Sequence, residues 1–216
     1  MKKTIYSKYD KKDINDLPIV QFEGRIIVIV SPGETEKAVD YLLSKDILGV
    51  DTETRPSFKK GQAHLVALLQ VATHDTCFLF RLNHTGLTPA LIRFLEDKTV
   101  PKIGLSWHDD IHSLHKRGNF EPGYFVDLQK HVGEIGVKDM SLQKLFANFF
   151  HLKIQKRQQL SNWESDVLTD KQKMYAATDA WACIKLYEEL LRLKNTNDYE
   201  LKKNENEIQE RVSEEG

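Results

Sequence analysis

Four apolar runs within the first 82 residues predict that this chain folds around a β-sheet. They span residues 25–30, 47–50, 64–72 and 77–82. Such short, uninterrupted runs are typical of strands that are buried on both faces. Only the polar residues 73–76 separate the last two runs, and this spacing indicates a β-hairpin.

The remaining segments show mainly helical signals. Ser31, Pro32 and Glu34 form a helix start, with the serine as N-cap, and this helix should run to about residue 44. Further helices are predicted over 88–96, 107–117, 141–150 and 170–194, with short strands over 102–105 and 125–127. Strands followed by helices indicate an α/β fold in which α-helices flank a mixed β-sheet.

We expect a single domain over residues 21–194. Residues 1–20 are polar and should form a flexible lead-in, and the charged residues 195–216 should extend the last helix or be disordered. The formal net charge of −1 argues against a binder driven by overall positive charge, although a local basic groove is compatible with it. With no signal peptide and no membrane-spanning run, we expect a cytoplasmic protein without a membrane partner.

The second predicted strand ends in two acids. Alternate residues on a strand share a face, so Asp51 and Glu53 point the same way. Two neighbouring negative charges repel each other, and burial increases the cost. Either these acids are solvated in a turn, or a cation lies between them.

The helix predicted over 107–117 contains two adjacent aspartates that helical phase distinguishes. Its core face is defined by Trp107, Ile111 and Leu114. Asp110 lies about 65° from the centre of that face and Asp109 nearly opposite. Ser106 and Asp109 also form a capping-box pattern, so we expect Asp109 to be structural or solvated. Three histidines share another face, for which solvation fits better than a zinc site: His108, His112 and His115.

The last helix places a third acid beside a tyrosine. Thr169 and Gln172 form a capping box at its start. Tyr175 and Asp179 are four residues apart and therefore share the inward face. Small residues would let this helix approach the sheet closely: Ala176, Ala177 and Ala180. Taken alone, the pair is explained by a buried aspartate that is hydrogen-bonded to a tyrosine.

Together these features give four inward-facing acids, Asp51, Glu53, Asp110 and Asp179. Four carboxylates in one pocket cannot all ionise without cations. Oxygen ligands without neighbouring cysteine or histidine ligands favour Mg²⁺ or Mn²⁺ over zinc. Two such ions about 3.5–4 Å apart are the usual device for phosphoryl displacement in nucleases. We therefore expect two divalent metal ions.

The pattern resembles the 3′–5′ exonucleases of the DEDD family, tyrosine branch, which have a ribonuclease-H-like fold. Three family motifs are matched in order: Asp-x-Glu at Asp51 and Glu53, Asp-x-x-x-Leu at Asp110 and Leu114, and Tyr-x-x-x-Asp at Tyr175 and Asp179. The likeness covers roughly residues 25–190. It is stronger to the Werner-syndrome-protein exonuclease domain than to ribonuclease D.

This resemblance implies hydrolysis of terminal phosphodiesters to nucleoside 5′-monophosphates, on a single-stranded or 3′-recessed nucleic acid. DNA is favoured over RNA as the substrate. It also implies that Asp51 and Asp179 hold one metal ion, whose bound water Tyr175 aims, and that Asp51 holds the second ion. How Glu53 and Asp110 divide between the two ions stays open.

Five residues are candidates for substrate binding: Phe58, Lys59, Lys60, Arg157 and Trp163. Phe58 or Trp163 could stack on a terminal base, and the cations could contact phosphates without reading sequence. The alternative for each cation is a solvated surface side chain, and Trp163 fits a place in the core better than an exposed one.

Three other functions remain in view. One is a catalytically silent nucleic-acid-binding module, although all four acids and the tyrosine are present. The second is an RNA-processing exoribonuclease of the ribonuclease D type. The third is endonucleolytic cleavage of the ribonuclease H type, against which the tyrosine motif argues.

Overall fold

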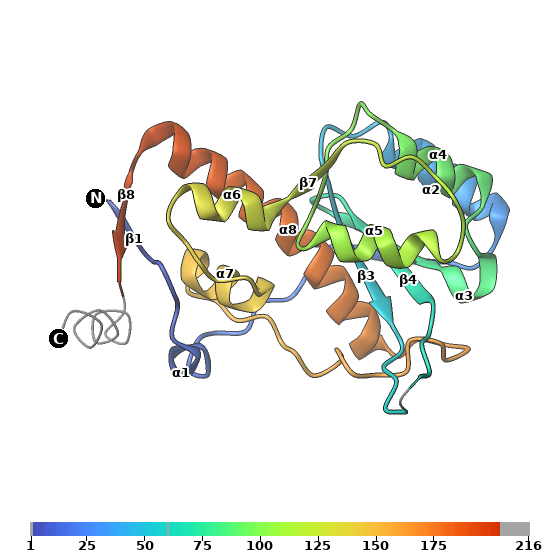
Figure 1. The fold of residues 1–216 in the computed structure, drawn as a ribbon, viewed down its shortest axis with the longest axis horizontal. Coiled ribbons are helices and arrows are strands. Elements are labelled where there is room, and N and C mark those ends of the chain that lie inside the picture. The colour runs from blue at the N-terminus through green and yellow to red at the C-terminus, as the bar shows by residue number, and fades with distance from the viewer. Residues whose placement is uncertain (1, 60, 204–216) are drawn as a thin grey trace.

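A six-stranded mixed β-sheet forms the centre of the molecule, and helices cover both of its faces (Figure 1). The computed structural model describes residues 2–59 and 61–203. The strand order in the sheet is β2-β5-β4-β3-β6-β7. The elements of this body are, in chain order, β2 (Arg25–Ile29), α2 (Pro32–Leu42), β3 (Leu48–Thr54), β4 (Val66–Ala72), β5 (Thr76–Arg81), α3 (Leu82–Thr85), α4 (Pro89–Glu96), β6 (Lys102–Gly104), α5 (Trp107–His115), β7 (Phe125–Asp127), α6 (Leu128–Glu134), α7 (Leu142–Phe150) and α8 (Asp170–Thr196).

The predicted hairpin and mixed sheet are confirmed. Strand β4 runs antiparallel to both of its neighbours, β3 and β5, whereas the pairs β2–β5, β3–β6 and β6–β7 are parallel. Strand β3 therefore lies inside the sheet, between β4 and β6. Strand β6 pairs only with Leu48 and Gly49, so the end of β3 that follows them is paired with β4 alone.

Side-chain alternation on β4 divides the core between the two faces of the sheet. Leu69 and Val71 pack in the cluster that contains the inner residues of α2 and α4. Leu68 and Ala72 pack in the cluster that contains the first half of α8. Because successive residues of a strand point to opposite faces, a buried run such as that of β4 serves both layers.

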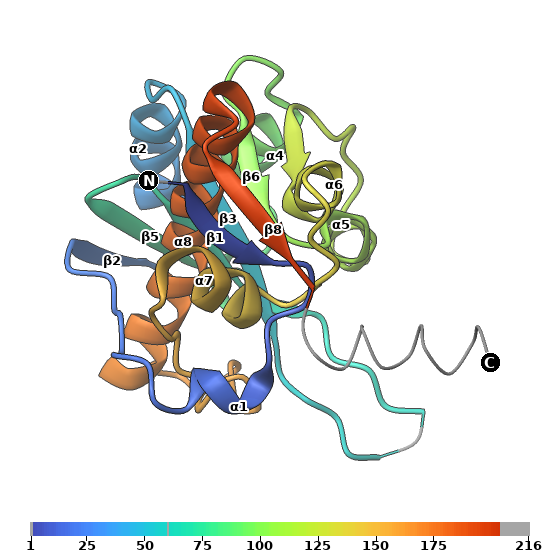
Figure 2. The ribbon, with the colours of Figure 1, turned by 90° about the vertical axis from the view of Figure 1, so that its left-hand side faces the viewer.

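The N-terminal segment is held in place, which corrects the expected flexible lead-in. Strand β1 (Lys3–Tyr6) pairs in parallel with β8 (Tyr199–Lys202), and the short helix α1 (Lys11–Ile14) follows (Figure 2). Ile5, Tyr9 and Ile14 are buried. No periodic signal marks this segment in the sequence, because these apolar residues are isolated among polar ones and their partners lie far along the chain.

Strand β8 also differs from the helical or disordered tail that was expected from residue 195. Helix α8 ends at Thr196, and Asn197 takes a left-handed conformation at its C-cap before β8 begins. Pairing with β1 is what makes this charged segment a strand. Residues 204–216 lie outside the described residues, and the three-part division of the chain stays a prediction.

Two smaller findings complete the fold. Helix α6 follows β7 directly and was not predicted, because its seven residues include Gly133 and offer too few turns for an apolar period. Among the described helices, none is both long enough and apolar enough to cross a bilayer. The cytoplasmic location stays a prediction.

Candidate active site

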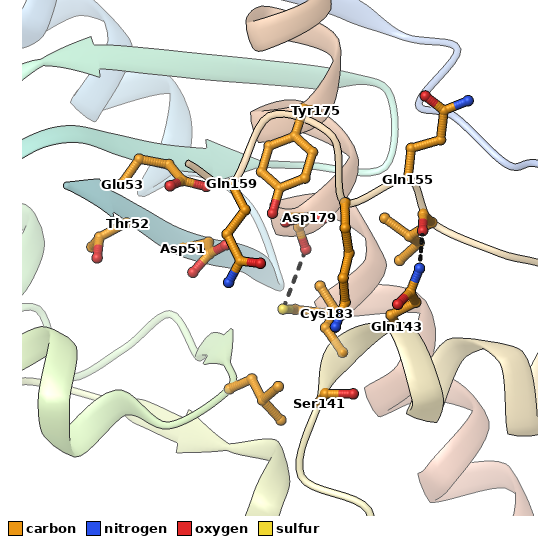
Figure 3. Close-up of a pocket in the computed structure, with 14 residues that line it drawn as sticks. Asp51, Thr52, Glu53, Ser141, Gln143, Gln155, Gln159, Tyr175, Asp179 and Cys183 are labelled. Atoms are coloured by element: carbon orange, nitrogen blue, oxygen red, sulfur yellow. Dashed lines mark hydrogen bonds between the residues drawn. The ribbon is translucent and has the colours of Figure 1, made fainter. Parts of the chain in front are cut away.

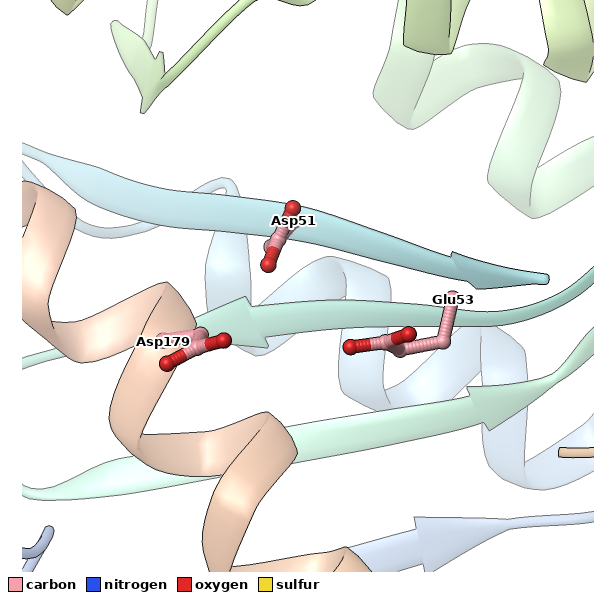
Figure 4. A group of neighbouring side chains, drawn as sticks. All are labelled: Asp51, Glu53 and Asp179. Carbon is pink, nitrogen blue, oxygen red and sulfur yellow. The ribbon is translucent and has the colours of Figure 1, made fainter. Parts of the chain in front are cut away.

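The end of strand β3 presents Asp51 and Glu53 to helix α8. Leu48 and Val50 face the opposite side, where they join the core beneath α2 and α4. Alternation therefore turns the two acids toward α8, as predicted (Figure 4). Glu53 is buried and Asp51 is half-buried.

Helix α8 brings Asp179 to the same place because it packs very closely on β3. A Cβ atom on Gly49 would lie 2.0 Å from the carbonyl oxygen of Ala180, so only glycine fits at this contact. The small alanines on this face of α8 are buried, as expected: Ala176, Ala177 and Ala180. One carboxylate oxygen from each of Asp51, Glu53 and Asp179 lies within 4.8 Å of the others.

The buried carboxylates of this group repel one another, which raises their pKa values. Burial, together with the charges of Asp110 and Asp179, raises the pKa of Asp51. Burial and the charge of Asp51 likewise raise the pKa of Glu53, and burial raises that of Asp179. Oδ1 of Asp179 is buried and has no hydrogen-bond partner among the described residues. A bound cation would remove both the repulsion and the unsatisfied oxygen.

Tyr175 lies one turn before Asp179 on α8, and its hydroxyl points toward that carboxylate (Figure 3). The hydroxyl favours the charged form of Asp179 and so partly offsets the rise of its pKa. Burial and the Asp179 charge raise the pKa of the Tyr175 phenol, which therefore stays protonated at neutral pH. The indole of Trp163 lies beside the tyrosine ring, with the ring centroids 6.1 Å apart.

Asp110 stands next to the three mutually close acids rather than within their group. It occupies the first turn of α5 and is half-buried, whereas Asp109 is exposed, as helical phase predicts. The hydroxyl of Thr52 donates a hydrogen bond to Asp110. Burial raises the pKa of Asp110, and its charge acts on Asp51.

The predicted capping box at the start of α5 is wrong. Ser106 is the N-cap, but its backbone is left-handed and its side chain makes no capping hydrogen bond. The carboxylate of Asp127 accepts hydrogen bonds from the backbone N–H groups of Ser106 and Trp107 instead. His108 and His112 are exposed, and the ring of His115 stacks on Phe120.

One wall of a cavity of about 280 Å³ is formed by Asp51, Glu53, Asp179 and Tyr175. The opposite wall is polar, and sequence reasoning did not find most of it (Figure 3). Its polar residues come from the start of α7 and from the irregular segment 154–159: Ser141, Gln143, Gln155, Lys156 and Gln159. The side-chain amide of Gln143 donates to the carbonyl of Ile154 at 2.7 Å and so joins the two segments.

Lys156 is the cation in the lining of this cavity. In the described part of the chain its ammonium group has no ion pair or hydrogen bond, and its charge lowers the pKa of Asp179. It projects from the segment before Ser161, where basic residues are frequent, but a sequence alone does not tell which of them faces the acids. The neighbouring Arg157 lines a second cavity, on the α8 side of the same segment.

The other candidate substrate contacts are scattered. Phe58 and Lys59 are exposed on the connection between β3 and β4, and Phe58 is 84% exposed. Lys60 lies outside the described residues. Trp163 is fully buried, so its place is in the core and it is closed to a nucleobase.

Known proteins resemble this chain in sequence and in fold. Over 192 residues, or 84% of the chain, it is 29% identical to the mouse protein (Mus musculus) named bifunctional 3′-5′ exonuclease/ATP-dependent helicase WRN. It spans only 14% of that protein.

Two solved structures share the fold. The Nibbler EXO domain of Aedes aegypti superposes with a TM-score of 0.73 at 21% identity, covering 82% of this chain and 92% of that one. Escherichia coli RNase D gives a TM-score of 0.70 at 16% identity, covering 81% of this chain and 46% of that one. These neighbours confirm the ribonuclease-H-like fold.

A family model extends the likeness from single relatives to a whole family. The model described as 3′-5′ exonuclease matches residues 27–194, which is well over half of the 216 residues. The match includes all four acids and Tyr175. The chain therefore belongs to the 3′–5′ exonuclease family, a family of hydrolases.

Proposed function

We propose that this protein is a metal-dependent exonuclease that removes nucleotides from the 3′ end of a nucleic acid as nucleoside 5′-monophosphates. The observation that carries the proposal is the group formed by Asp51, Glu53 and Asp179, whose oxygens lie within 4.8 Å of one another in a buried cavity. Such a group is costly without a cation, and so its presence favours a metal centre over a structural role.

The residues of the cavity fit two Mg²⁺ or Mn²⁺ ions. The donor atoms are carboxylate oxygens, which hard divalent ions prefer, and the buried Oδ1 of Asp179 lacks any other partner among the described residues. Asp51 and Asp179 would hold one ion, and Asp51 with Glu53 or Asp110 the other. When bound, such ions lower the pKa of a coordinated water and stabilise charge on the leaving oxygen.

The protein side chains then have separate tasks. Tyr175 stays neutral, and its hydroxyl would hold the attacking water by a hydrogen bond and so orient it toward the terminal phosphorus. Asp110, with Thr52, would fix the side of the site that receives the leaving 3′-oxygen. The attacking water releases a proton to solvent as its oxygen bonds to phosphorus, the bond from phosphorus to the 3′-oxygen breaks, and the departing oxygen takes up a proton from solvent.

The substrate reaches the cavity beside Asp51, Glu53 and Asp179 as a single strand or as a recessed 3′ end. Phe58 and Lys59 lie on the connection that leaves β3 directly after the acids, where they could stack on a base and contact a phosphate. The cavity volume is near the lower bound of about 300 Å³ for ligand pockets, which suits one terminal nucleotide rather than a duplex.

We favour DNA over RNA as the substrate, as the resemblance to the Werner-syndrome-protein exonuclease domain implies, and the mouse protein named WRN is 29% identical over 84% of this chain. The second candidate is an exoribonuclease, since the E. coli RNase D that shares the fold is described as an exoribonuclease involved in structured RNA processing. A catalytically silent binding module fits less well, because it would keep the cost of the buried acids without their use.

A time course on 5′-labelled DNA and RNA tests the proposal. Single strands and duplexes with recessed 3′ ends are incubated with Mg²⁺, Mn²⁺ or EDTA, and Asp110→Asn is run in parallel. We expect a metal-dependent ladder that shortens from the 3′ end and disappears in the variant, and its rate identifies the preferred sugar. Intact substrate with every metal, while binding persists, would instead establish the silent module.

A further inference from the structure

The start of helix α5 is built in an unusual way. Ser106, its N-cap, has φ 62° and ψ 39°, and its side chain makes no capping hydrogen bond. N-cap residues are normally extended and cap the helix themselves. The other non-glycine residues with positive φ in the described chain are His151 and Asn197, which end helices, where this conformation is ordinary. A left-handed backbone is unfavourable for serine, so this helix start needs support from its surroundings.

Asp127 provides that support. Its Oδ1 accepts a hydrogen bond from the Ser106 N–H at 3.1 Å, and its Oδ2 accepts one from the Trp107 N–H at 3.2 Å. Oδ1 also accepts from the Gln129 N–H at 3.0 Å, which caps α6. The side-chain amide of Gln129 donates a hydrogen bond to the Ser106 hydroxyl. One carboxylate therefore caps two helices and holds the turn between β6 and α5.

Sheet pairing delivers Asp127 to this turn. Strand β7 pairs with β6 so that Asp127 lies opposite Gly104, the last residue of β6. A Cβ atom on Gly104 would lie 2.4 Å from Nε1 of Trp107, so the indole packs against bare backbone. Only Leu105 and Ser106 separate β6 from α5, and Leu105 lines the acid cavity.

The same turn determines where Asp110 lies, because Asp110 is in the first turn of α5. We propose that Asp127 is a positioning residue: by capping α5 it holds Asp110 beside Asp51, so that both carboxylates can bind the same metal centre. The inference rests on the proposed metal-dependent function. Residues that orient metal ligands from outside the coordination sphere typically change metal affinity by about 10–100-fold when they are replaced.

Direct Mn²⁺ binding to the full-length chain tests this role. Free Mn²⁺ is measured by electron paramagnetic resonance during titration of the parent, Asp127→Asn and Asp127→Ala. Thr88→Ala is the control, because the Thr88 side chain caps its own helix, α4, and lies outside the cavity lining. Removing either cap should lower the unfolding temperature, since N–H groups in the first turn of the helix lose their acceptor.

We expect the Kd for Mn²⁺ to rise about tenfold in Asp127→Ala and less in Asp127→Asn, which keeps one acceptor oxygen. In Thr88→Ala it should equal the parent value. In activity assays, the Mn²⁺ concentration for half-maximal rate should shift by the same factor, while the substrate KM at saturating Mn²⁺ stays constant. A merely structural cap would lower the unfolding temperature and leave the metal dependence alone.

Two results would overturn the inference: unchanged Mn²⁺ affinity in the Asp127 variants, or an equal loss of affinity in Thr88→Ala. If Asp127→Ala does not fold, Asp127→Asn decides, because it preserves the shape of the side chain. A parent protein that binds no Mn²⁺ would reject the proposed function and this inference together. A parent that binds Mn²⁺ alongside unaffected variants rejects the inference alone.

Discussion

The two walls of the cavity are built in opposite ways. The acid wall stands on β3, inside the sheet, and on α8, which contacts β3 so closely that Gly49 is required. The facing wall consists of the first residues of α7 and the irregular segment 154–159. The first wall is made of regular elements with buried cores, and the second of loops and amides.

The facing wall is held by contacts from distant parts of the chain. Ile19 forms an isolated bridge with Lys153, directly before the wall segment, and the side-chain amide of Asn148 on α7 pairs with Tyr6. The N-terminal segment, residues 2–20, thus braces this wall, and all of it precedes the family match that begins at residue 27. The difference suggests a division of labour, in which the rigid wall performs the chemistry and the braced wall shapes substrate binding.

Loss of one acid should have the largest effect. Asp179→Asn should lower kcat by about 10³-fold or more, because it removes a charged residue of the proposed metal site and leaves the fold intact. In EDTA, the free energy of unfolding should rise by about 1 kcal/mol, since the substitution removes a buried negative charge beside Asp51 and Glu53. Single-turnover kinetics and urea unfolding measure the two quantities.

Asp109→Asn is the control for that experiment, because Asp109 is an exposed acid one residue from Asp110. It should change neither kcat nor stability by a measurable amount. If Asp179→Asn retained a tenth of the activity, the acid wall would not be the wall that performs the chemistry, and the comparison of the two walls would fail.

Removing the tyrosine hydroxyl should have the next largest effect. Tyr175→Phe keeps the ring against Trp163 and should lower kcat by about 10²-fold, the usual contribution of a group that orients a reacting water or proton. Mn²⁺ affinity should stay within twofold of the parent, because the ring supplies no metal ligand. A loss of metal affinity that matched the loss of rate would assign the hydroxyl to the metal site instead.

The acid wall could be predicted from the sequence because its signals are local. Asp51 and Glu53 are two residues apart on a strand, and Tyr175 and Asp179 four apart on a helix, so the geometry of one element fixes each pair. Helical phase separated Asp110 from its neighbour in the same way. Bringing these pairs together required only that α8 pack on the sheet.

The facing wall and the cap of α5 could not be predicted in this way. Asn148 pairs with Tyr6 across 142 positions, and β1 pairs with β8 across nearly the whole described chain. The capping rule selected Ser106, whereas the oxygen atoms come from Asp127, which sheet pairing delivers from 21 residues further on. Local patterns name the residues of an element, but tertiary contacts decide which of them meet.

Replacing Lys156, the cation in the cavity lining, tests whether the facing wall contributes to substrate binding. Lys156→Ala should raise the substrate KM by about 3–10-fold and weaken its salt dependence, while kcat changes less than threefold, because the side chain offers a charge to a phosphate but no ligand to a metal. Arg157→Ala is the matched neighbour and should have a smaller effect, since Arg157 lines the second cavity. The reverse ranking would move the substrate path to that second cavity.

Removing the hydrogen bonds between Asn148 and Tyr6 should have the smallest effect on turnover. The Asn148 side chain donates to the Tyr6 carbonyl at 2.7 Å and accepts from the Tyr6 N–H at 2.8 Å, in a fully buried position. Asn148→Ala leaves both groups unpaired and should cost about 1–3 kcal/mol of unfolding free energy. Because α7 carries Gln143 into the facing wall, KM should rise about twofold while kcat is retained.

Urea unfolding and steady-state kinetics measure these changes, with Thr88→Ala as a variant of similar stability loss on the other face of the sheet. A KM that rises only in Asn148→Ala would connect the N-terminal strand to substrate binding. A kcat that falls tenfold at constant KM would mean that loosening α7 disturbs the acids across the cavity. The two walls would then act as one unit, because rigidity in the acid wall would depend on the brace opposite it.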